Sequence, residues 1–460
     1  ILGETIYDSG PNGQRPAMVL SDSLKSLGLK LMRFKTGTPA RVDRRTIDFE
    51  KTSIQKGDPT APAFSFLTTE MPREQTPCYL TYTNAATHEV IRANLHRAPM
   101  ANGVIEGIGP RYCPSVETKI ARFPDKDRHQ LFLEPEGLHT NEIYVQGMST
   151  SLPTDVQEAF LTTIPGLEHA RIMRPGYAIE YDCLDPLQLE ATLAVKHIVG
   201  LYSAGQANGT SGYEEAAAQG LVAGVNAVRE IAGEEPLVLR RSDGYIGVLI
   251  DDLVTKGTDE PYRMMTSRAE YRLILRQDNA DLRLTPMGRS IGLVSDERWA
   301  RFTAKRDAIE ETLHLLESTK LSPSAETEAR LAGAGIQPLR VPMSLFALLS
   351  REGNYDVLVP LFDLPALAAD VKEEVEIMAR YDGYIKKQQE QIARMERLES
   401  RRIPKTLDYA AITSLRLEAA EKLAAIRPRS IGQAARISGV SPADISVLLV
   451  YLEKERRTQS

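Results

Sequence analysis

The stretch "LYSAGQANGTSGYEEAAAQGLVAG", residues 201–224, decides the fold class of this chain. It is typical of a short strand ending near Ala204, a glycine-rich loop and a helix of small residues. Gly205, Gly209 and Gly212 let the backbone turn sharply and approach a ligand, and the helix beginning near Gly212 offers unpaired N–H groups to an anion. A small-residue helix packed on a strand without a ligand explains the pattern equally well. The stretch therefore predicts an α/β fold and leaves both interpretations open.

A second nucleotide-binding turn is missing. The nearest match to G-x-G-x-x-G is "GIGPRY", residues 107–112, in which Tyr112 stands where the third glycine belongs. A bulky side chain there blocks close helix–strand packing. The chain therefore lacks the turn that would bind the other end of a dinucleotide.

Composition and charge limit the function classes. The chain has 460 residues, 42% of them hydrophobic and 26% charged, as soluble globular proteins do. Its net charge is −6, so the molecule as a whole repels phosphate, and nucleic-acid binding requires a local basic patch. Three separated cysteines without C-x-x-C spacing predict no metal site, no disulfide framework and a reducing compartment. The longest apolar run, "ISVLLVYL", is too short to span a bilayer, and the first residue, Ile1, leaves targeting signals open.

The order of turn, strand and helix signals predicts five segments. Residues 1–48 and 110–231 alternate strand and helix signals as in a doubly wound parallel sheet. Residues 49–109 are loop-rich with short strand-like runs such as "PCYLTYT" and form an inserted smaller domain. Residues 232–380 and 381–460 are mostly helical, with long amphipathic runs over 298–321 and 373–402.

Longer stretches carry a resemblance over nearly the whole chain. "KTGTPARVDRRTIDF", "GVIEGIGPRYCPSVETKI", "FLEPEGLHTNEIYVQGMSTSLP", "EPYRMMTSRAEYRLILRQDNADLRLT" and "SIGQAARISGVSPADISVLLVYL" occur in order. Together with the glycine loop they resemble the tRNA uridine 5-carboxymethylaminomethyl modification enzymes, the glucose-inhibited division protein A family. The resemblance implies a partial FAD-binding domain of the Rossmann-like, glutathione-reductase type, with an all-α C-terminal region. Family members begin with a G-x-G-x-x-G unit for the ADP half of FAD, which this chain lacks, so the loop is identified as the flavin-side half.

Cofactor contacts are implied by the resemblance, residue by residue. The inserted domain belongs to the nicotinamide and substrate side, and NADH or NADPH is implied as the reductant of the flavin. Ala17 departs from relatives that carry a flavin-contacting Ser. The implied FAD contacts are Thr36, Gly37, Thr38, Gly205, Gln206, Gly209, Thr210, Gly212 and Tyr213, and the implied NAD contacts are Gly109, Pro110, Arg111 and Tyr112.

Cys113 is the candidate for covalent catalysis. Pro114 suits a first helical position, so we expect Cys113 at a helix N-terminus, with Arg111 and Lys119 nearby. These features lower a thiol pKa and favour the thiolate. The resemblance implies that this thiolate adds to C6 of uracil and activates C5. A small buried core thiol is the alternative, and we expect that role for the other two cysteines, Cys78 and Cys183.

Four arginines are the candidate nucleic-acid patch. A helix or a strand would put Arg268, Arg272 and Arg276 on one face, and Arg263 precedes them. A solvated face balanced by neighbouring acidic residues explains the charges equally well, but the resemblance favours contact with tRNA phosphates.

The last residues have helix–turn–helix signals. Ser430 and Ser441 are expected helix caps, Gly439 the turn and Pro442 a first helical residue. The second helix, "ADISVLLVYL", lacks the polar side chains that read base edges, which argues against DNA. The resemblance implies a docking domain for tRNA and a GTPase partner over 381–460.

The implied function is a flavin-dependent change to C5 of the anticodon wobble uridine. The resemblance implies a carboxymethylaminomethyl or aminomethyl group built from methylenetetrahydrofolate and glycine or ammonium, with a GTPase partner, in a cytoplasmic homodimer, with a mitochondrial homologue left open. One alternative is the related folate- and FAD-dependent tRNA uridine C5-methyltransferase, against which the long helical C-terminal region argues. Another is a non-catalytic fragment that binds tRNA and a partner.

Overall fold

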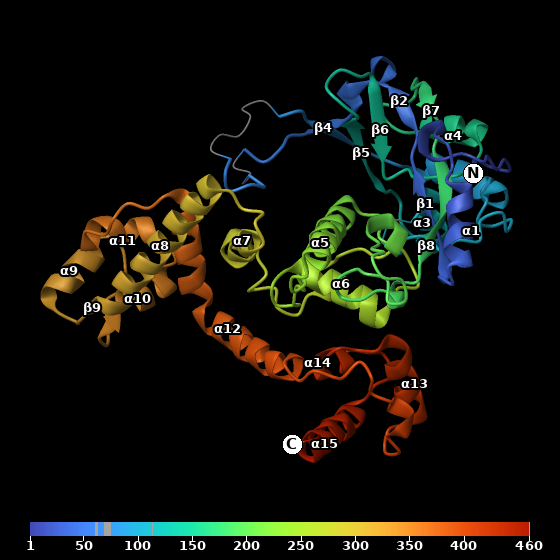
Figure 1. Ribbon diagram of the computed structural model, residues 1–460. Coiled ribbons are helices and arrows are strands. Elements are labelled where there is room, and N and C mark those ends of the chain that lie inside the picture. The colour runs from blue at the N-terminus through green and yellow to red at the C-terminus, as the bar shows by residue number, and fades with distance from the viewer. Residues whose placement is uncertain (60–62, 69–74, 113, 460) are drawn as a thin grey trace. The chain divides into compact units, whose positions relative to one another are not determined.

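The computed structural model describes residues 1–59, 63–68, 75–112 and 114–459 (Figure 1). The chain forms two compact units, one of Ile1–Leu237 with Gly257–Arg263 and the other of Val238–Lys256 with Met264–Ser460. Among the described residues, no helix combines the length and the apolar character that a membrane span requires. The expected α/β fold followed by a helical region is confirmed.

The first unit is built around a six-stranded sheet in the order β3-β4-β5-β6-β2-β7 (Figure 1). The expected strand at "PCYLTYT" is confirmed as β4, at the centre of the β3-β4-β5 half. The expected domain boundaries lie between residues 48 and 49 and between residues 109 and 110. The sheet contains strands from both sides of each boundary, and the boundaries stay predictions. The strands are β2 Arg41–Asp43, β3 Ser53–Gln55, β4 Cys78–Tyr82, β5 Gln130–Pro135, β6 Glu142–Gln146 and β7 Ile172–Arg174.

One face of this sheet carries the core of the first unit. Leu131 and Leu133 on β5 are fully buried, because alternate residues of a strand point to the same face. Three helices, α2 Ala85–Ala93, α3 Val116–Arg122 and α4 Thr154–Leu161, contribute Ile91, Ile120 and Phe160 to the same hydrophobic cluster. The remaining helices of this unit are α1 Met18–Ser26 and α5 Tyr213–Ala232.

The pairing of the strands differs from the parallel pattern expected for 1–48 and 110–231. Within the described residues, every ladder between named strands is antiparallel, and the one parallel pairing is the isolated bridge between Phe34 and Ile108. The reason is loop length: six residues, 136–141, separate β5 from β6, and a parallel crossover needs about twelve or more. These two strands therefore form a hairpin.

A second ladder, β1 Leu31–Thr38 with β8 Tyr177–Leu184, positions the candidate site. The strands pair antiparallel in register from Leu31 opposite Leu184 to Thr38 opposite Tyr177. Phe34 of β1 lies opposite Tyr181 of β8, and their rings make an edge contact at 6.2 Å. This buried aromatic pair supports the strand end that carries Thr36 and Thr38.

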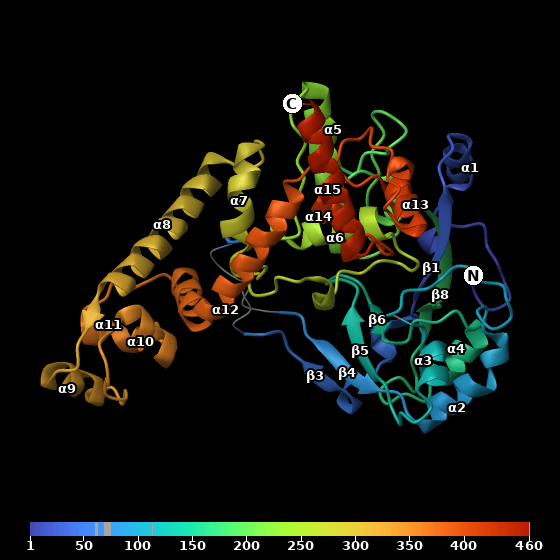
Figure 2. The ribbon, with the colours of Figure 1, turned by 90° about the horizontal axis from the view of Figure 1, so that it is seen from below.

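The second unit is helical apart from the short pair β9 Lys320–Leu321 and β10 Met343–Ser344. The two long helices expected near 298–321 and 373–402 are confirmed as α8 Asp296–Ser318 and α12 Ala369–Glu399. Helix α12 continues unbroken from the group around α8–α11 to the group α13–α15 (Figures 1 and 2). The other helices are α6 Tyr245–Lys256, α7 Ala280–Ser290, α9 Ala325–Gly333, α10 Leu345–Glu352, α11 Tyr355–Phe362, α13 Leu417–Ile426, α14 Ile431–Ala434 and α15 Pro442–Gln459.

The single tryptophan of the chain lies on α8. The ring centroids of Trp299 and Phe302 are 5.1 Å apart. The guanidinium of Arg289, from the last turn of α7, lies 5.8 Å from the indole centroid. The indole therefore joins α7 to α8 through an aromatic and a cation–π contact.

Candidate functional site

The glycine loop begins as a 3-10 turn, Gly205–Asn208, directly before the long helix α5. The strand expected to end near Ala204 is wrong: only an isolated bridge joins Tyr202 to Ala194. The chain reverses at Gly200, which has a φ of +78°, so too few residues run side by side to make a ladder. The helix start expected near Gly212 is confirmed.

Buried Gln219 on α5 holds the loop closed. Its Oε1 accepts hydrogen bonds from the Gly205 N–H at 3.1 Å and from Asn208 Nδ2 at 2.9 Å. Its Nε2 donates to Thr210 Oγ1 at 2.6 Å. Thr210 is fully buried and its hydroxyl serves this framework, whereas the side chains of Gln206 and Tyr213 are exposed. Sequence reasoning missed Gln219, because a polar residue 14 positions after Gly205 gives no local signal of this contact.

Gly209 packs the loop against β1. Its φ is +82°, and a Cβ added there would lie 3.0 Å from the ring of Phe34. Side chains of β1 alternate, so Thr36 and Thr38 lie on the same face of the strand as Phe34. These two threonines lie on a paired strand rather than in a proline turn, and Thr38 Oγ1 accepts from Arg41 Nη1 at 2.5 Å. The structure thus brings Thr36, Gly37 and Thr38 and the glycine loop into one neighbourhood.

The N-terminus of α5 is free of a side-chain cap among the described residues. The N-cap residue is Gly212, which has no side chain that could accept hydrogen bonds from the first N–H groups of this 20-residue helix. These N–H groups can therefore bind an anion. Arg263, one of the four arginines assigned to the nucleic-acid patch, lies here: its Nε donates to Glu215 Oε1 at 3.1 Å. A Cβ at position 212 would lie 1.9 Å from Glu215 Oε2, so a larger residue there would displace this ion pair.

The implied nicotinamide segment runs beside β1. The Lys35 N–H donates to the Ile108 carbonyl at 3.0 Å, and a Cβ at Gly109 would lie 2.8 Å from the Lys35 side chain. Pro110 follows directly, and the side chains of Arg111 and Tyr112 beyond it are exposed.

Cys113 lies outside the described residues. Its expected place at a helix N-terminus therefore stays a prediction. The expectation that Pro114 is a first helical residue is wrong, because α3 begins at Val116 with Ser115 in the extended N-cap position. The Ser115 hydroxyl pairs with Thr118 Oγ1 at 2.9 Å, and serine is a favoured N-cap residue. Lys119 on α3 donates from Nζ to the Gly147 carbonyl at 3.1 Å.

The expectation of a buried core thiol is confirmed for Cys183 and not for Cys78. Cys183 is buried on β8, and burial raises the pKa of its thiol to about 12. Burial also raises the pKa of Cys78, which is half-buried on β4. Among the residues that the structure covers, no group of three or more His, Cys, Asp or Glu side chains could hold a metal ion.

The other three arginines of the patch belong to the second unit. Their segment is neither a helix nor a strand beyond the short turn Thr266–Arg268, so the expected regular face is wrong. The segment is irregular because Ala269, Tyr271 and Leu275 point into a cluster with Val248. Alternation of buried and exposed residues leaves the side chains of Arg268 and Arg272 on the surface.

Arg276 differs from Arg272 because its charge is already matched. Its Nη2 donates to Glu374 Oε1 of α12 at 2.6 Å, and its Nε donates to Asp278 Oδ2 at 2.9 Å. Burial and the neighbouring Asp278 raise the pKa of the Glu374 carboxyl to about 7. Arg272 is exposed and forms no ion pair within the described part of the chain.

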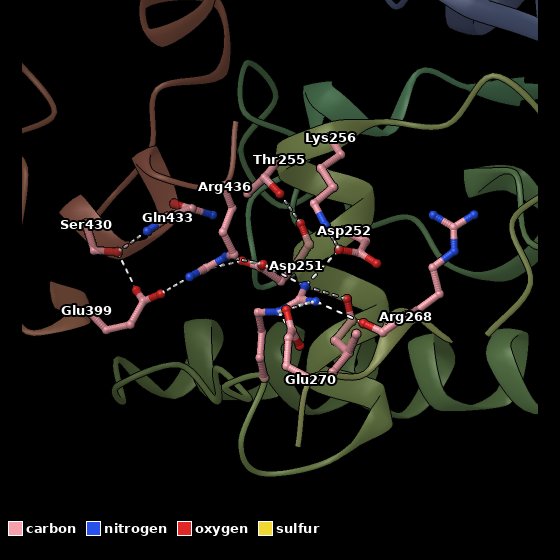
Figure 3. A network of polar contacts seen from close by, with 12 residues as sticks. Asp251, Asp252, Thr255, Lys256, Arg268, Glu270, Glu399, Ser430, Gln433 and Arg436 are labelled. Atoms are coloured by element: carbon pink, nitrogen blue, oxygen red, sulfur yellow. Dashed lines mark hydrogen bonds and ion pairs between the residues drawn. The ribbon is translucent and has the colours of Figure 1, made fainter. Parts of the chain in front are cut away.

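A buried guanidinium fixes the backbone of the arginine segment (Figure 3). Arg241 donates from Nη2 to the Arg268 carbonyl at 3.2 Å and to Glu270 Oε1 at 2.7 Å. Its Nη1 donates to Asp251 and Asp252 of α6 at 3.0 and 2.8 Å. Burial opposes the charge of Arg241, but Asp252 and Asp251 outweigh it and raise the pKa. The segment that presents Arg268 and Arg272 is therefore anchored to α6.

Comparison with known proteins defines the class: an α/β chain with a C-terminal helical region shared with tRNA modification enzymes. Three family models match, "Glucose inhibited division protein A" over residues 1–235 and the MnmG/GidA C-terminal helical domain and helical bundle over 296–389 and 391–460. The chain belongs to the glucose-inhibited division protein A family.

Similar proteins agree with this assignment over almost the whole chain. The "tRNA uridine 5-carboxymethylaminomethyl modification enzyme MnmG" of Caldicellulosiruptor saccharolyticus is 58% identical over 99% of this chain and 73% of its own length. The enzyme of that name from Clostridium botulinum strain Loch Maree is 57% identical with the same coverage. A crystal structure of Aquifex aeolicus GidA superposes with a TM-score of 0.88 at 45% identity, covering 98% of this chain and 72% of that one.

Gln219→Leu is expected to destabilise the first unit. The substitution leaves two buried donors, the Gly205 N–H and Asn208 Nδ2, without their acceptor, at about 1–3 kcal/mol each. Urea unfolding measures the loss. Gln206→Leu, on the exposed side of the same loop, is the control and is expected to change stability by less than about 0.5 kcal/mol. Equal midpoints for the two variants would contradict the role of Gln219.

Glu374→Gln is expected to gain stability relative to the unchanged chain as pH rises from 5 to 8. The folded-state pKa of about 7 lies above the unfolded value near 4.5, so the folded state holds the extra proton in that window and loses stability as pH increases. Glutamine cannot titrate, which removes a slope of up to about 1.4 kcal/mol per pH unit. The exposed neighbour substitution Glu373→Gln is the control. Unfolding midpoints that run parallel across this range would refute the shifted pKa.

Proposed function

We propose that this chain is the flavin-side and tRNA-binding part of an enzyme that modifies C5 of the anticodon wobble uridine. The observation that carries the proposal is the glycine loop, closed by Gln219 and packed on β1, directly before the uncapped N-terminus of α5. Similar proteins named as tRNA uridine 5-carboxymethylaminomethyl modification enzymes support it.

The loop fits a flavin. Gln206 is exposed while the polar groups behind it are satisfied internally, so its amide is available to a ligand. The uncapped N–H groups of α5 suit a negative charge on the ring, whereas the charge of Arg263 is matched by Glu215. Thr36, Gly37 and Thr38 would border the same ligand from β1. Bound FAD would supply the redox chemistry, and these residues would bind and orient it.

A reduced nicotinamide would approach from the segment beside β1. Gly109 has no Cβ, and a Cβ there would lie 2.8 Å from the Lys35 side chain, so the segment can run close to β1. The exposed side chains of Arg111 and Tyr112 remain available to NADH or NADPH.

Cys113 is proposed as the nucleophile toward the uridine. Its thiolate would form a bond to C6 of uracil, and the electron pair of the C5–C6 double bond would move to the C4 carbonyl as an enolate. C5 would then form a bond to the methylene carbon of a one-carbon electrophile, for which methylenetetrahydrofolate is proposed, as one bond from that carbon to a folate nitrogen breaks. Loss of the C5 proton and release of the thiolate would restore the ring. Glycine or ammonium would supply the amine: its nitrogen would bond to the methylene carbon, the remaining bond to folate nitrogen would break, and tetrahydrofolate would leave. We propose that a GTPase partner takes part and that the enzyme is a cytoplasmic homodimer.

Cys113→Ser is expected to leave FAD binding unchanged and to abolish tRNA modification, because a hydroxyl at neutral pH is a far weaker nucleophile than a thiolate. Flavin fluorescence titration measures the first property, and mass analysis of nucleosides from treated tRNA measures the second. Cys78→Ser, on β4, is the control and is expected to retain both. Modification by the Cys113 variant would remove this thiol from the mechanism.

Arg272→Ala is expected to weaken tRNA binding and to lower the slope of log affinity against log salt by about 1, because one phosphate contact is lost. Filter binding between 50 and 200 mM salt measures the slope. Arg330→Ala is the control, since the Arg330 side chain is also exposed but pairs with Glu326 on its own helix. An unaltered slope in the Arg272 variant would exclude a phosphate contact there.

A further inference from the structure

Asp251 on α6 binds two guanidinium groups, that of Arg241 shortly before α6 and that of Arg436 after α14 (Figure 3). Its Oδ2 accepts from Arg241 Nη1 at 3.0 Å and from Arg436 Nε at 2.6 Å, and its Oδ1 accepts from Arg436 Nη2 at 2.8 Å. The side chains of Asp251, Arg241 and Arg436 are only 12%, 8% and 14% exposed. The removal of any one of these charges would leave the others buried with fewer charged partners.

Arg436 is fixed to the C-terminal bundle on its other side. Its Nη1 donates to Glu399 Oε1, at the end of α12, at 2.5 Å. The second carboxylate oxygen of Glu399 accepts from the hydroxyl of Ser430. Ser430 is the N-cap of α14, because its Oγ accepts from the Gln433 N–H at 3.0 Å. The guanidinium therefore follows any displacement of α14 and of the end of α12.

Arg241 carries the connection onward to the arginine segment. It donates to the Arg268 carbonyl and to the Glu270 carboxylate, four and two residues before Arg272. The segment makes no regular ladder or helix at these positions, so these contacts and the cluster around Val248 define its backbone. A continuous series of charged hydrogen bonds thus runs from α14 through Asp251 to the segment that presents Arg272.

We propose that Arg436 and Asp251 are positioning residues that hold the arginine segment in its RNA-binding conformation, so that the C-terminal bundle and Arg272 form one nucleic-acid surface. The inference rests on the proposed tRNA binding by Arg272. The proposed role of Arg436 and Asp251 requires no contact with RNA, because their charged groups are already paired with each other. The coupling makes the bundle a determinant of RNA affinity at a segment more than 150 residues earlier in the chain.

Burial opposes the charge of Arg436, but the hydrogen bonds and charge of Asp251 outweigh it and raise the pKa. The Arg436 guanidinium therefore stays protonated to high pH.

Hydrogen exchange of the full chain tests the positioning directly and needs no RNA. Arg436→Gln is expected to speed exchange of the amides in 264–272, and Arg436→Lys, which keeps one charge but loses the fork, is expected to do so less. Arg416→Gln is the control, because Arg416 also pairs with a buried aspartate, Asp444, at 2.6 Å inside the C-terminal bundle, although its own side chain is 52% exposed. Unchanged exchange over 264–272 in folded Arg436→Gln and Arg436→Lys, or an equal increase in Arg416→Gln, overturns the proposal.

A double-mutant cycle with Arg272→Ala separates positioning from direct contact. The probe is a tRNA transcript with uridine at the first anticodon position. Arg436→Gln is expected to weaken its binding roughly 2–30-fold when Arg272 is present and to have little further effect in the Arg272→Ala background. Equal weakening in both backgrounds overturns the inference. If Arg272→Ala alone leaves binding and its salt slope unchanged, the proposed RNA contact fails instead, and the exchange measurement still decides the positioning role.

Discussion

A guanidinium taken out of water has to be surrounded by carboxylates, and Arg241 imposes that constraint on the second unit. Desolvation of an arginine costs several kcal/mol unless neighbouring charges and hydrogen bonds compensate. Here Asp251 and Asp252 from one turn of α6 meet Glu270 from an irregular segment at the same guanidinium. The constraint explains how a segment without ladder or helix can keep one conformation. It also explains why the end of α12 and α14 are bonded to α6 through Asp251 rather than through apolar packing alone.

The first unit meets a similar constraint with a neutral side chain. A glycine loop exposes backbone N–H and carbonyl groups on two sides. A ligand can form hydrogen bonds only with the groups on the side that faces it, and the protein has to pair the others. Gln219 on α5 supplies an acceptor and a donor, so the loop forms its hydrogen bonds without a ligand. A binding loop that is shaped in advance loses less conformational entropy when it binds. The price is a polar side chain fully enclosed in the core of the first unit.

Sequence signals predicted the features of the fold that depend on neighbouring residues. The start of α5, the capping by Ser430 and the extents of α8 and α12 follow from residues within a few positions of each other. Long-range contacts were not predictable in this way. Nothing near Arg276 indicates that Glu374, 98 residues later, occupies its guanidinium, whereas Arg272 stays exposed. Equal spacing in the sequence made these arginines equivalent, and tertiary contacts made them different.

The start of α3 shows a competition between two good signals. Pro114 favours a first helical position and serine is a favoured N-cap residue; the helix begins after Ser115, whose hydroxyl pairs with Thr118 Oγ1 rather than with a backbone N–H. The family resemblance extended the sequence analysis to chemistry that such rules do not reach, because the relation between the glycine loop and a second, upstream nucleotide turn is a property of whole domains. Residue spacing alone left the ligand of that loop undecided.

The packing of Trp299 gives the chain a built-in optical reporter. Tryptophan emission depends on the immediate surroundings of the indole, and the only indole of this protein lies between Phe302 and Arg289 in the second unit. Tyrosine does not absorb at the red edge of the protein absorption band, so emission excited there comes from this one residue and follows the junction of α7 and α8.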